Sequence, residues 1–282
     1  MKPRLFGIPA LRSPVVVVLR RGPSDWSQVL RWNPHAGTLD RGSWIRANLY
    51  PQRCDLSPDG RFLTYFTLRP AAAWAAGPTY IAVSRLPWLT ALAAWGTCGT
   101  WTCGLHFVDN HRTWEVDQPA EGHIEPLRDR YRFGLELTGP PAFAVERRRG
   151  WTETSDSPPY DHDLDPWDIR RVPQLTMEKP QPGSTDTVHL TVTGWFAAYR
   201  SGQPSWNEVV YTIRHDDMSR RLKDVQWADW DQAGRLLVAT TTGRLEVRRE
   251  PWGVTDTAWS VDLGDDRPEP AEPPTIARRW IE

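Results

Sequence analysis

The 282-residue sequence predicts an all-β protein, and two observations carry that prediction. Its 20 Gly and 26 Pro residues interrupt the chain about as often as short strands and turns require. Long stretches with apolar residues at the 3.6-residue spacing of a helix are hard to find. We therefore expect one domain, residues 1–282, built from short strands and long enough to bury a full core.

One hairpin pattern occurs twice, at residues 55–66 and 229–240, which start 174 residues apart. Each copy has a short strand, a turn that contains Gly, and a second strand with apolar residues at alternate positions. In the first copy Pro58 presets the turn backbone, Asp59 tolerates the next position and Gly60 closes the turn. Three further hairpins with the same pattern are expected around the turns Ser13-Pro14, Asp109-Asn110 and Thr193-Gly194.

The spacing of these turns predicts a β-propeller. Counted between Ser13, Gly60, Asn110, Gly194 and Gly234, the steps are 47, 50, 84 and 40 residues. Four-stranded blades take about 40 to 50 residues, so three steps fit one blade each and the long step contains an insertion. We place that insertion at residues 151–183, where Pro, Asp, Ser and Thr are dense. Five blades are predicted, with six as the alternative.

Further strand candidates complete the blades, and the two chain ends are expected to close the ring. After an Asp/Glu/Pro-rich segment at 264–274, residues 275–282 are expected to add a strand beside residues 15–20, which leaves no strand edge bare. The other candidates lie at 29–32, 45–50, 79–85, 89–95, 131–137, 142–146, 208–214, 244–249 and 257–263.

Residues 57–66, which read Ser-Pro-Asp-Gly followed by a strand, resemble the repeat of TolB-type proteins among the WD40-like propellers. Residues 232–240 match the same repeat with Ala233 in place of the Asp. The resemblance implies a propeller fold. It implies little about function, because one fold serves many functions. TolB-type proteins are periplasmic, and this chain shows no export signal, so their cellular role is not carried over.

Charge and cysteine content indicate a cytoplasmic protein without nucleic-acid or membrane partners. The net charge is -1 and the pI is near 6.7, which gives no general attraction to phosphates or anionic lipids. Three Cys residues are a small and odd number, whereas a disulfide framework normally uses more of them in pairs. No apolar stretch has the length of a signal-peptide core or a membrane span. The preference for Arg over Lys indicates a GC-rich bacterial genome.

The charges are segregated along the sequence. Residues 1–150 carry 19 Lys+Arg and 12 Asp+Glu, a net charge of +7, whereas residues 151–282 carry 15 and 23, a net charge of -8. Two interpretations remain open: solvated loops without further purpose, or charge-driven self-association that weakens with salt.

A metal site is not predicted, although Cys98, Cys103, His106 and His111 include the ligand types of a zinc site. Structural zinc motifs begin with two Cys separated by two to four residues on a tight knuckle, and the residues between Cys98 and Cys103 have the pattern of a strand. We interpret the four residues as isolated core thiols and turn histidines, and we predict no cofactor.

The insertion contains the residues that we predict to bind a partner. Three interpretations of it remain: a solvated loop, an arm that docks a protein through its aromatic residues, and a hard-cation site. A calcium loop normally has a Gly at its bend and a terminal Glu, and residues 161–168 have neither. The docking arm is the functional hypothesis that we carry forward, with the candidate contacts Trp151, Tyr160, Asp161, Asp163, Asp165 and Trp167.

The function predicted from the sequence is a non-enzymatic scaffold for protein–protein interaction. The chain has no Gly-x-Ser-x-Gly elbow, P-loop or dinucleotide fingerprint. The alternative is a glycosidase-like enzyme or small-ligand binder that uses paired carboxylates at the channel mouth. Its candidates are Asp55, Asp109, Asp229 and Asp231, although Asp at a hairpin turn is ordinarily explained by hydrogen bonds to the backbone.

Overall fold

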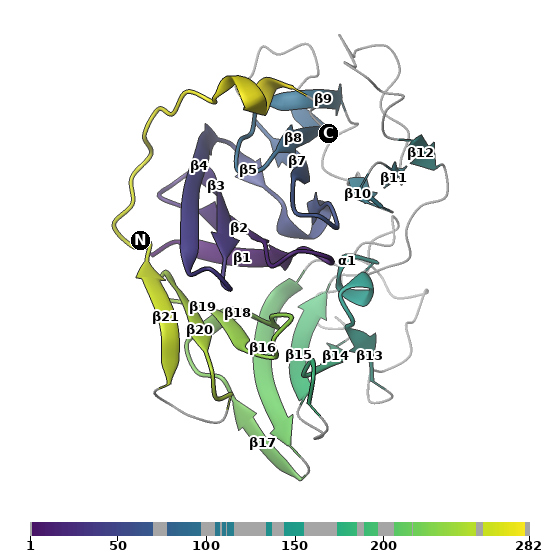
Figure 1. Ribbon diagram of the computed structural model, residues 1–282, viewed down its shortest axis with the longest axis vertical. Helices are drawn as coiled ribbons and strands as arrows, with labels where there is room; N and C mark the ends of the chain where they lie inside the picture. The colour runs from purple at the N-terminus through teal and green to yellow at the C-terminus, as the bar shows by residue number, and fades with distance from the viewer. Residues whose placement is uncertain are drawn as a thin grey trace. The chain divides into compact units, whose positions relative to one another are not determined.

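The structure is a computed structural model, and its described residues form an all-β fold of five sheets (Figure 1). The all-β prediction is confirmed. The helical elements in this part of the chain are short: α1 (Ala144–Arg148) and the 3-10 turns η1 (Pro51–Arg53) and η4 (Thr275–Arg278). The described residues are 2–69, 78–96, 105–107, 109–110, 112–115, 134–136, 144–154, 174–184, 189–196, 206–215, 217–251 and 256–279.

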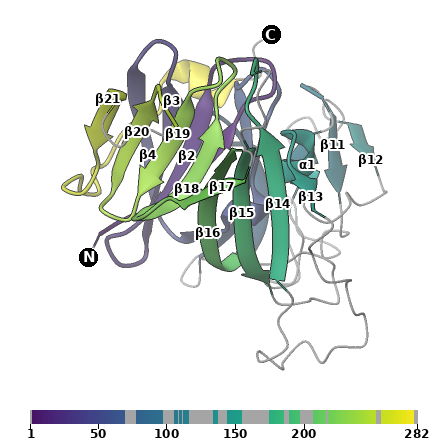
Figure 2. The same cartoon turned by 90° about the horizontal axis from the view of Figure 1, so that it is seen from below.

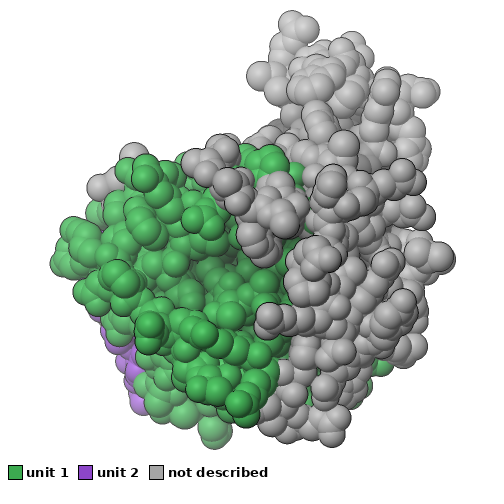
Figure 3. All heavy atoms as spheres, turned by 90° about the horizontal axis from the view of Figure 1, so that it is seen from above, with its two compact units in different colours: residues 1–140, 265–282 green, residues 141–264 purple. Residues whose placement is uncertain are grey.

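The chain forms two compact units. Unit 1 comprises residues 1–140 and 265–282, and unit 2 comprises residues 141–264 (green and purple in Figure 3). Both ends of the chain therefore belong to unit 1.

Unit 1 contains three sheets (Figure 1). The first is an antiparallel sheet with the order β1-β2-β3-β4. The second has the order β5-β7-β8-β9, with β6 also paired to β7, and the third has the order β10-β11-β12. The strands are β1 (Arg4–Pro9), β2 (Val16–Arg21), β3 (Trp26–Asn33), β4 (Thr38–Arg46), β5 (Asn48–Leu49), β6 (Asp55–Leu56), β7 (Phe62–Leu68), β8 (Thr79–Arg85), β9 (Ala91–Gly96), β10 (Leu105–Phe107), β11 (Arg112–Glu115) and β12 (Gly134–Glu136).

The hairpin turns of successive sheets in unit 1 contact each other. The Arg12 N–H donates to the Pro58 carbonyl at 2.7 Å, which joins the β1-β2 turn to the β6-β7 turn. The Asp59 N–H donates to Asn110 Oδ1 at 3.0 Å, which joins the β6-β7 turn to the β10-β11 turn. Gly60, with φ +76°, lies so close to the first turn that a Cβ there would be 2.7 Å from Ser13 Oγ. The neighbouring turn therefore requires a residue without a side chain here.

The core of the second sheet is aromatic and continues into β10. Phe66, Leu105 and Phe107 are buried in one cluster, and Tyr50 packs against it in a T-shaped arrangement with Phe66 at a centroid distance of 5.3 Å. The Thr64 hydroxyl donates to the Leu105 carbonyl at 2.5 Å. Apolar burial and a buried hydrogen bond thus hold neighbouring sheets together.

Unit 2 contains two antiparallel sheets with the orders β13-β14-β15-β16-β17 and β18-β19-β20-β21 (Figure 2). Their common core includes Trp151, Met177, Ile213, Trp230 and Val238. The strands are β13 (Thr152–Glu153), β14 (Gln174–Pro180), β15 (His189–Phe196), β16 (Trp206–His215), β17 (Met218–Arg221), β18 (Val225–Trp230), β19 (Leu236–Thr240), β20 (Arg244–Arg248) and β21 (Thr257–Asp262).

The fourth hairpin turn was placed wrongly by the sequence pattern. Thr193 and Gly194 lie in the middle of β15, where they pair with both β14 and β16. The turn between β14 and β15 instead begins at Gln181 and contains Gly183, whose φ is +72°. The apolar alternation after Gly194 imitates the strand that follows Gly60, but strand pairing depends on both neighbours rather than on one segment.

The predicted insertion is shorter than the sequence indicated. Both β13 and β14 lie inside the interval 151–183. The two strands pair with each other, with Thr152 opposite Glu178, so the long connection is the segment 155–173 between them.

Two predicted strands are wrong. Residues 144–148 form α1 instead of a strand, and this segment has Glu146 in its first turn and two Arg residues in its last, which complements the helix dipole. Residues 275–278 form η4, and β2 is flanked by β1 and β3 instead of by a C-terminal strand. The adjacent segment β1 supplies the pairing through a short hairpin, which costs less loop entropy than a partner at the far end of the chain.

Candidate functional site

Asp55 in β6 is completely buried and uses both carboxylate oxygens to hold backbone amides. Oδ1 accepts from the Leu56 N–H at 2.8 Å, and Oδ2 accepts from the Phe107 N–H in β10 at 2.8 Å. The side chain therefore ties its own strand to the next sheet. Losing either hydrogen bond would leave a buried polar group without a partner, so this contact is a firm structural link.

Asp229 in β18 occupies the equivalent position of the second hairpin copy and is 3% exposed. Oδ1 accepts from the Trp230 N–H at 2.7 Å and from Lys179 Nζ at 2.5 Å. Oδ2 accepts from the Trp151 indole N–H at 3.5 Å. Burial, together with the charge of Asp229, raises the pKa of the Tyr211 hydroxyl well above its usual value. The tyrosine therefore stays neutral beside a buried ion pair.

The turn carboxylates are also engaged. In the first copy Asp59 Oδ1 accepts from the Arg61 N–H at 3.0 Å and Oδ2 accepts from Arg61 Nε at 2.6 Å. In the second copy Asp231 makes the same two contacts with Arg235, at 2.8 and 2.7 Å. Asp231 stands at the position of Ser57, four residues before the Arg. The second turn lacks an Asp at position 233 because its carboxylate comes from position 231.

Three of the four carboxylates proposed for a channel site thus hold structural hydrogen bonds: Asp55, Asp229 and Asp231. Asp109 is half-buried in the bend before β11 and interacts with other residues of the fold. These contacts support the ordinary explanation of the repeated Asp residues, which is that they stabilise the hairpin backbone.

The zinc-ligand string is only partly within the described residues. His106 is 1% exposed in β10 and interacts with other parts of the fold, whereas Cys98, Cys103 and His111 lie outside the described residues. Where the structure describes side chains, it contains no group of three His, Cys, Asp or Glu residues arranged to hold a metal ion.

Of the predicted partner contacts, the structure places Trp151 in the core of unit 2, where it is 5% exposed. It belongs to the same buried cluster as Met177 and Trp230, so this residue is not on the surface. The other five, Tyr160, Asp161, Asp163, Asp165 and Trp167, lie outside the described residues. The described residues on either side define the base of the segment that carries them.

The base of this segment is fixed by strand pairing. The Thr154 N–H donates to the Thr176 carbonyl at 3.0 Å, next to the pair formed by Glu153 and Met177. Trp151 precedes β13 and is anchored in the core through Asp229. Residues 154 and 174 therefore leave and re-enter the sheet at one place, and the chain between them is the 19-residue segment 155–173.

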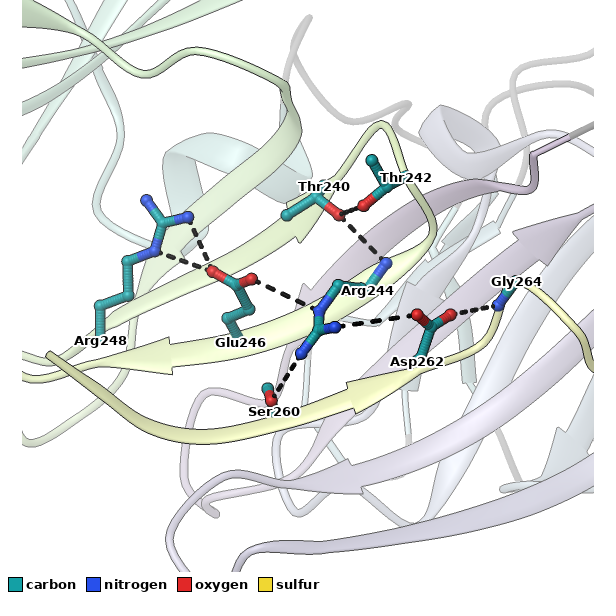
Figure 4. Close-up of polar contacts among 8 residues, drawn as sticks. All are labelled: Thr240, Thr242, Arg244, Glu246, Arg248, Ser260, Asp262 and Gly264. Atoms are coloured by element: carbon teal, nitrogen blue, oxygen red, sulfur yellow. Dashed lines mark hydrogen bonds and ion pairs between the residues drawn. The ribbon is translucent and has the colours of Figure 1, made fainter. Parts of the chain in front are cut away.

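The outward face of β20 and β21 carries a ladder of charged side chains (Figure 4). Glu246 accepts from Arg248 at 2.7 Å and lies 3.8 Å from Arg244, which in turn lies 3.8 Å from Asp262. Leu245 and Val247, between them in sequence, are fully buried on the other face. Opposite charges alternate along the face, which stabilises the strand pair and keeps the edge strand polar.

The fold and these contacts define an all-β protein of mainly antiparallel sheets, in which buried aspartates join neighbouring segments. No protein-family model matches the chain, and none of the curated proteins compared with it matches either. The helices in the described part of the chain are too short to cross a membrane.

Sequence reasoning missed the buried partner of Asp229. Lys179 is 12% exposed, and the chain contains only three Lys residues against 31 Arg. A rare Lys within a strand of apolar and polar alternation is a signal for a specific role, because a buried Lys requires a partner. The signal does not identify that partner, which lies 50 residues away.

Proposed function

We propose that this protein is a non-enzymatic, five-bladed β-propeller of the WD40-like, TolB-type class that serves as a scaffold for protein–protein interaction in the bacterial cytoplasm. The observation that carries the scaffold proposal is the base of the 155–173 segment. A long connection between two adjacent, paired strands has both ends held in one place, which is the arrangement of a binding loop on a rigid support.

Contacts between successive turns support the propeller proposal. In unit 1 the turn at Gly60 contacts the turn at Ser13, and in unit 2 the turn at Gly234 contacts the turn at Gln181. Gln181 Nε2 donates to the Gly234 carbonyl at 2.6 Å. A repeated contact between equivalent turns is what radially arranged blades require, because each blade then meets the previous one in the same way.

The arm residues Tyr160, Asp161, Asp163, Asp165 and Trp167 are the proposed contacts, with aromatic rings as anchors and carboxylates around them. Trp151 is assigned a different role from that expected: it fixes the base of the arm in the core. The net charges of +7 on residues 1–150 and -8 on residues 151–282 favour self-association, which light scattering across salt concentrations tests.

The scaffold proposal is tested by replacing residues 155–173 with Asn-Gly, which leaves the pairing of Thr154 with Thr176 in place. We expect an unchanged unfolding midpoint, because the base is held by β13 and β14, and a loss of at least about tenfold in partner recovered from the native host. A second variant, which keeps the arm and replaces only Tyr160 and Trp167 by Ala, should lose partner to a similar extent. Equal recovery with the shortened protein would show that the arm is not the contact region.

A further inference from the structure

An unusual arginine lies on one face of the first sheet. Arg20 in β2 is 2% exposed, and it pairs across the strands with Gln28, which in turn pairs with Trp44 in β4. Its guanidinium lies 4.7 Å from the centre of the Trp44 ring and donates to Gln28 Oε1 at 3.3 Å. We name Arg20, Gln28, Trp44 and the neighbouring Arg41 the basic row.

The basic row is occupied by a residue from the C-terminal segment. The backbone carbonyl of Asp266 accepts from Arg20 at 2.9 Å. Its carboxylate accepts from Arg41 Nε at 2.8 Å and from a second Arg41 nitrogen at 3.4 Å. One acidic residue thus contacts both arginines: its main chain accepts from Arg20, and its carboxylate accepts from two nitrogens of Arg41, as acidic peptides are recognised by arginine.

The basic row holds more positive charge than Asp266 neutralises. Burial lowers the pKa of Arg20; the charge of Asp266 opposes this shift, and Arg267 and Arg41 add to it. Arg20 Nε is buried and has no hydrogen-bond acceptor among the described residues. A guanidinium offers five donors, so the row has capacity for a further acceptor.

The occupying segment is suited to displacement. Residues 265–274 read Asp-Asp-Arg-Pro-Glu-Pro-Ala-Glu-Pro-Pro and form neither helix nor strand. Most of them are exposed, and Arg41 itself is 48% exposed. Beyond them, η4 contacts β8 and buries Ala277 completely (Figure 1). The segment is therefore anchored in the core at Ala277, whereas at Asp266 it is held by polar contacts to Arg20 and Arg41.

We infer that the basic row is a docking site for an acidic, proline-containing peptide segment of a partner protein, and that Asp266 is an internal ligand which the partner displaces. This inference rests on the proposed scaffold function and adds a second contact surface to it. The chemistry of the partner follows from the resident segment: a carboxylate for Arg41, a backbone carbonyl for Arg20, and prolines that keep the peptide extended at low entropic cost.

The test uses the full chain and a fluorescent peptide with the sequence of residues 263–274, measured by fluorescence anisotropy at low salt. Asp266→Ala removes the carboxylate that holds Arg41 and leaves the segment only its backbone contact to Arg20. We therefore expect this variant to bind the peptide at least about tenfold more tightly than the wild type. Adding Arg41→Ala to it should reverse that gain. Glu269→Ala, which removes an exposed carboxylate from the same segment, is the matched control and should bind like the wild type. Asp266→Asn serves as a second opened variant if Asp266→Ala is unstable.

Equal peptide affinity for the wild type and both Asp266 variants would overturn the inference, as would binding that is insensitive to Arg41→Ala. These outcomes leave the scaffold proposal intact, because partner recovery by the 155–173 arm is measured separately. Conversely, if the protein without residues 155–173 recovers as much partner as the wild type and the Asp266 variants bind the peptide tightly, the basic row remains as the contact surface. Affinity should fall with salt, because the recognition is between charges.

Discussion

Asp55 and Asp229 lie 174 residues apart and make the same two kinds of hydrogen bond. Each uses Oδ1 to accept the N–H of the residue that follows it, at 2.8 and 2.7 Å. Each uses Oδ2 to accept an N–H from outside its own sheet: from the Phe107 backbone in β10 in one case, and from the indole of Trp151, just before β13, in the other. The two copies of the hairpin therefore share a contact to a neighbouring part of the fold as well as a turn.

Only Asp229 has a charged partner, Lys179, so we expect replacement of the two aspartates to lower the free energy of unfolding by different amounts. Asp55→Asn leaves one buried amide without a good acceptor and should reduce the free energy of unfolding by about 1–3 kcal/mol. Asp229→Asn also leaves Lys179 buried without its counter-charge and should cost about 3–5 kcal/mol. Urea unfolding followed by Trp fluorescence measures both. Adding Lys179→Met to Asp229→Asn should recover part of the loss; no recovery would argue against the ion pair as the cause.

Gly234 and Gly183 form a matched pair for measuring the contact between turns. Both have positive φ, +74° and +72°, so alanine strains the backbone at either position by about 1–2 kcal/mol. Only at Gly234 would the new Cβ also lie 2.6 Å from the Pro182 carbonyl, whereas at Gly183 nothing lies within 4 Å. Gly234→Ala should therefore lower the unfolding midpoint clearly more than Gly183→Ala does. Equal effects would mean that the turns do not meet.

Asp59 predicts part of the acid sensitivity of the protein. Burial opposes the shift, but hydrogen bonds from Ser57 and Arg61 lower the pKa of Asp59 below its usual value. A carboxyl with a lowered folded pKa stabilises above its unfolded pKa, about 3.9, and this contribution is lost as the pH falls through the folded pKa. Asp59→Asn should cost up to about 1 kcal/mol at pH 7, since the pair is partly exposed. The difference between variant and wild type should shrink as the pH falls through the folded pKa of Asp59; a difference that stays constant with pH would contradict this.

Cys54 is predicted to be unreactive in the folded protein. The thiol is fully buried, and burial raises its pKa to about 12. At pH 8 its thiolate fraction is then about 10⁻⁴, compared with roughly a quarter for a free cysteine. In a Cys98→Ser/Cys103→Ser background, iodoacetamide should label Cys54 only under unfolding conditions, as measured by mass spectrometry. Rapid labelling without denaturant would show that this part of unit 1 opens.

Several features could be predicted from local sequence. The Gly60 and Gly234 turns, the strand 79–85 and the all-β class follow from turn chemistry and alternation over a few residues, and the structure has β8 at Thr79–Arg85. The predicted turn at Thr193-Gly194 was wrong although it rested on the same kind of local pattern as the correct predictions. A local pattern reports what a segment favours, and in β15 the pairing with β14 and β16 on both sides overrode it.

The sequence by itself determined that the chain folds into short strands and that one hairpin is repeated, because these depend on backbone preferences of neighbouring residues. Only the tertiary structure decided that Trp151 is a core residue, that Lys179 pairs with Asp229, and that Asp266 accepts hydrogen bonds from Arg20 and Arg41. Each of these contacts joins residues far apart in the chain: 50 residues for the ion pair and 246 for Arg20 and Asp266. Such contacts form when sheets pack and bury charge together, and no spacing along the sequence records which partners will meet.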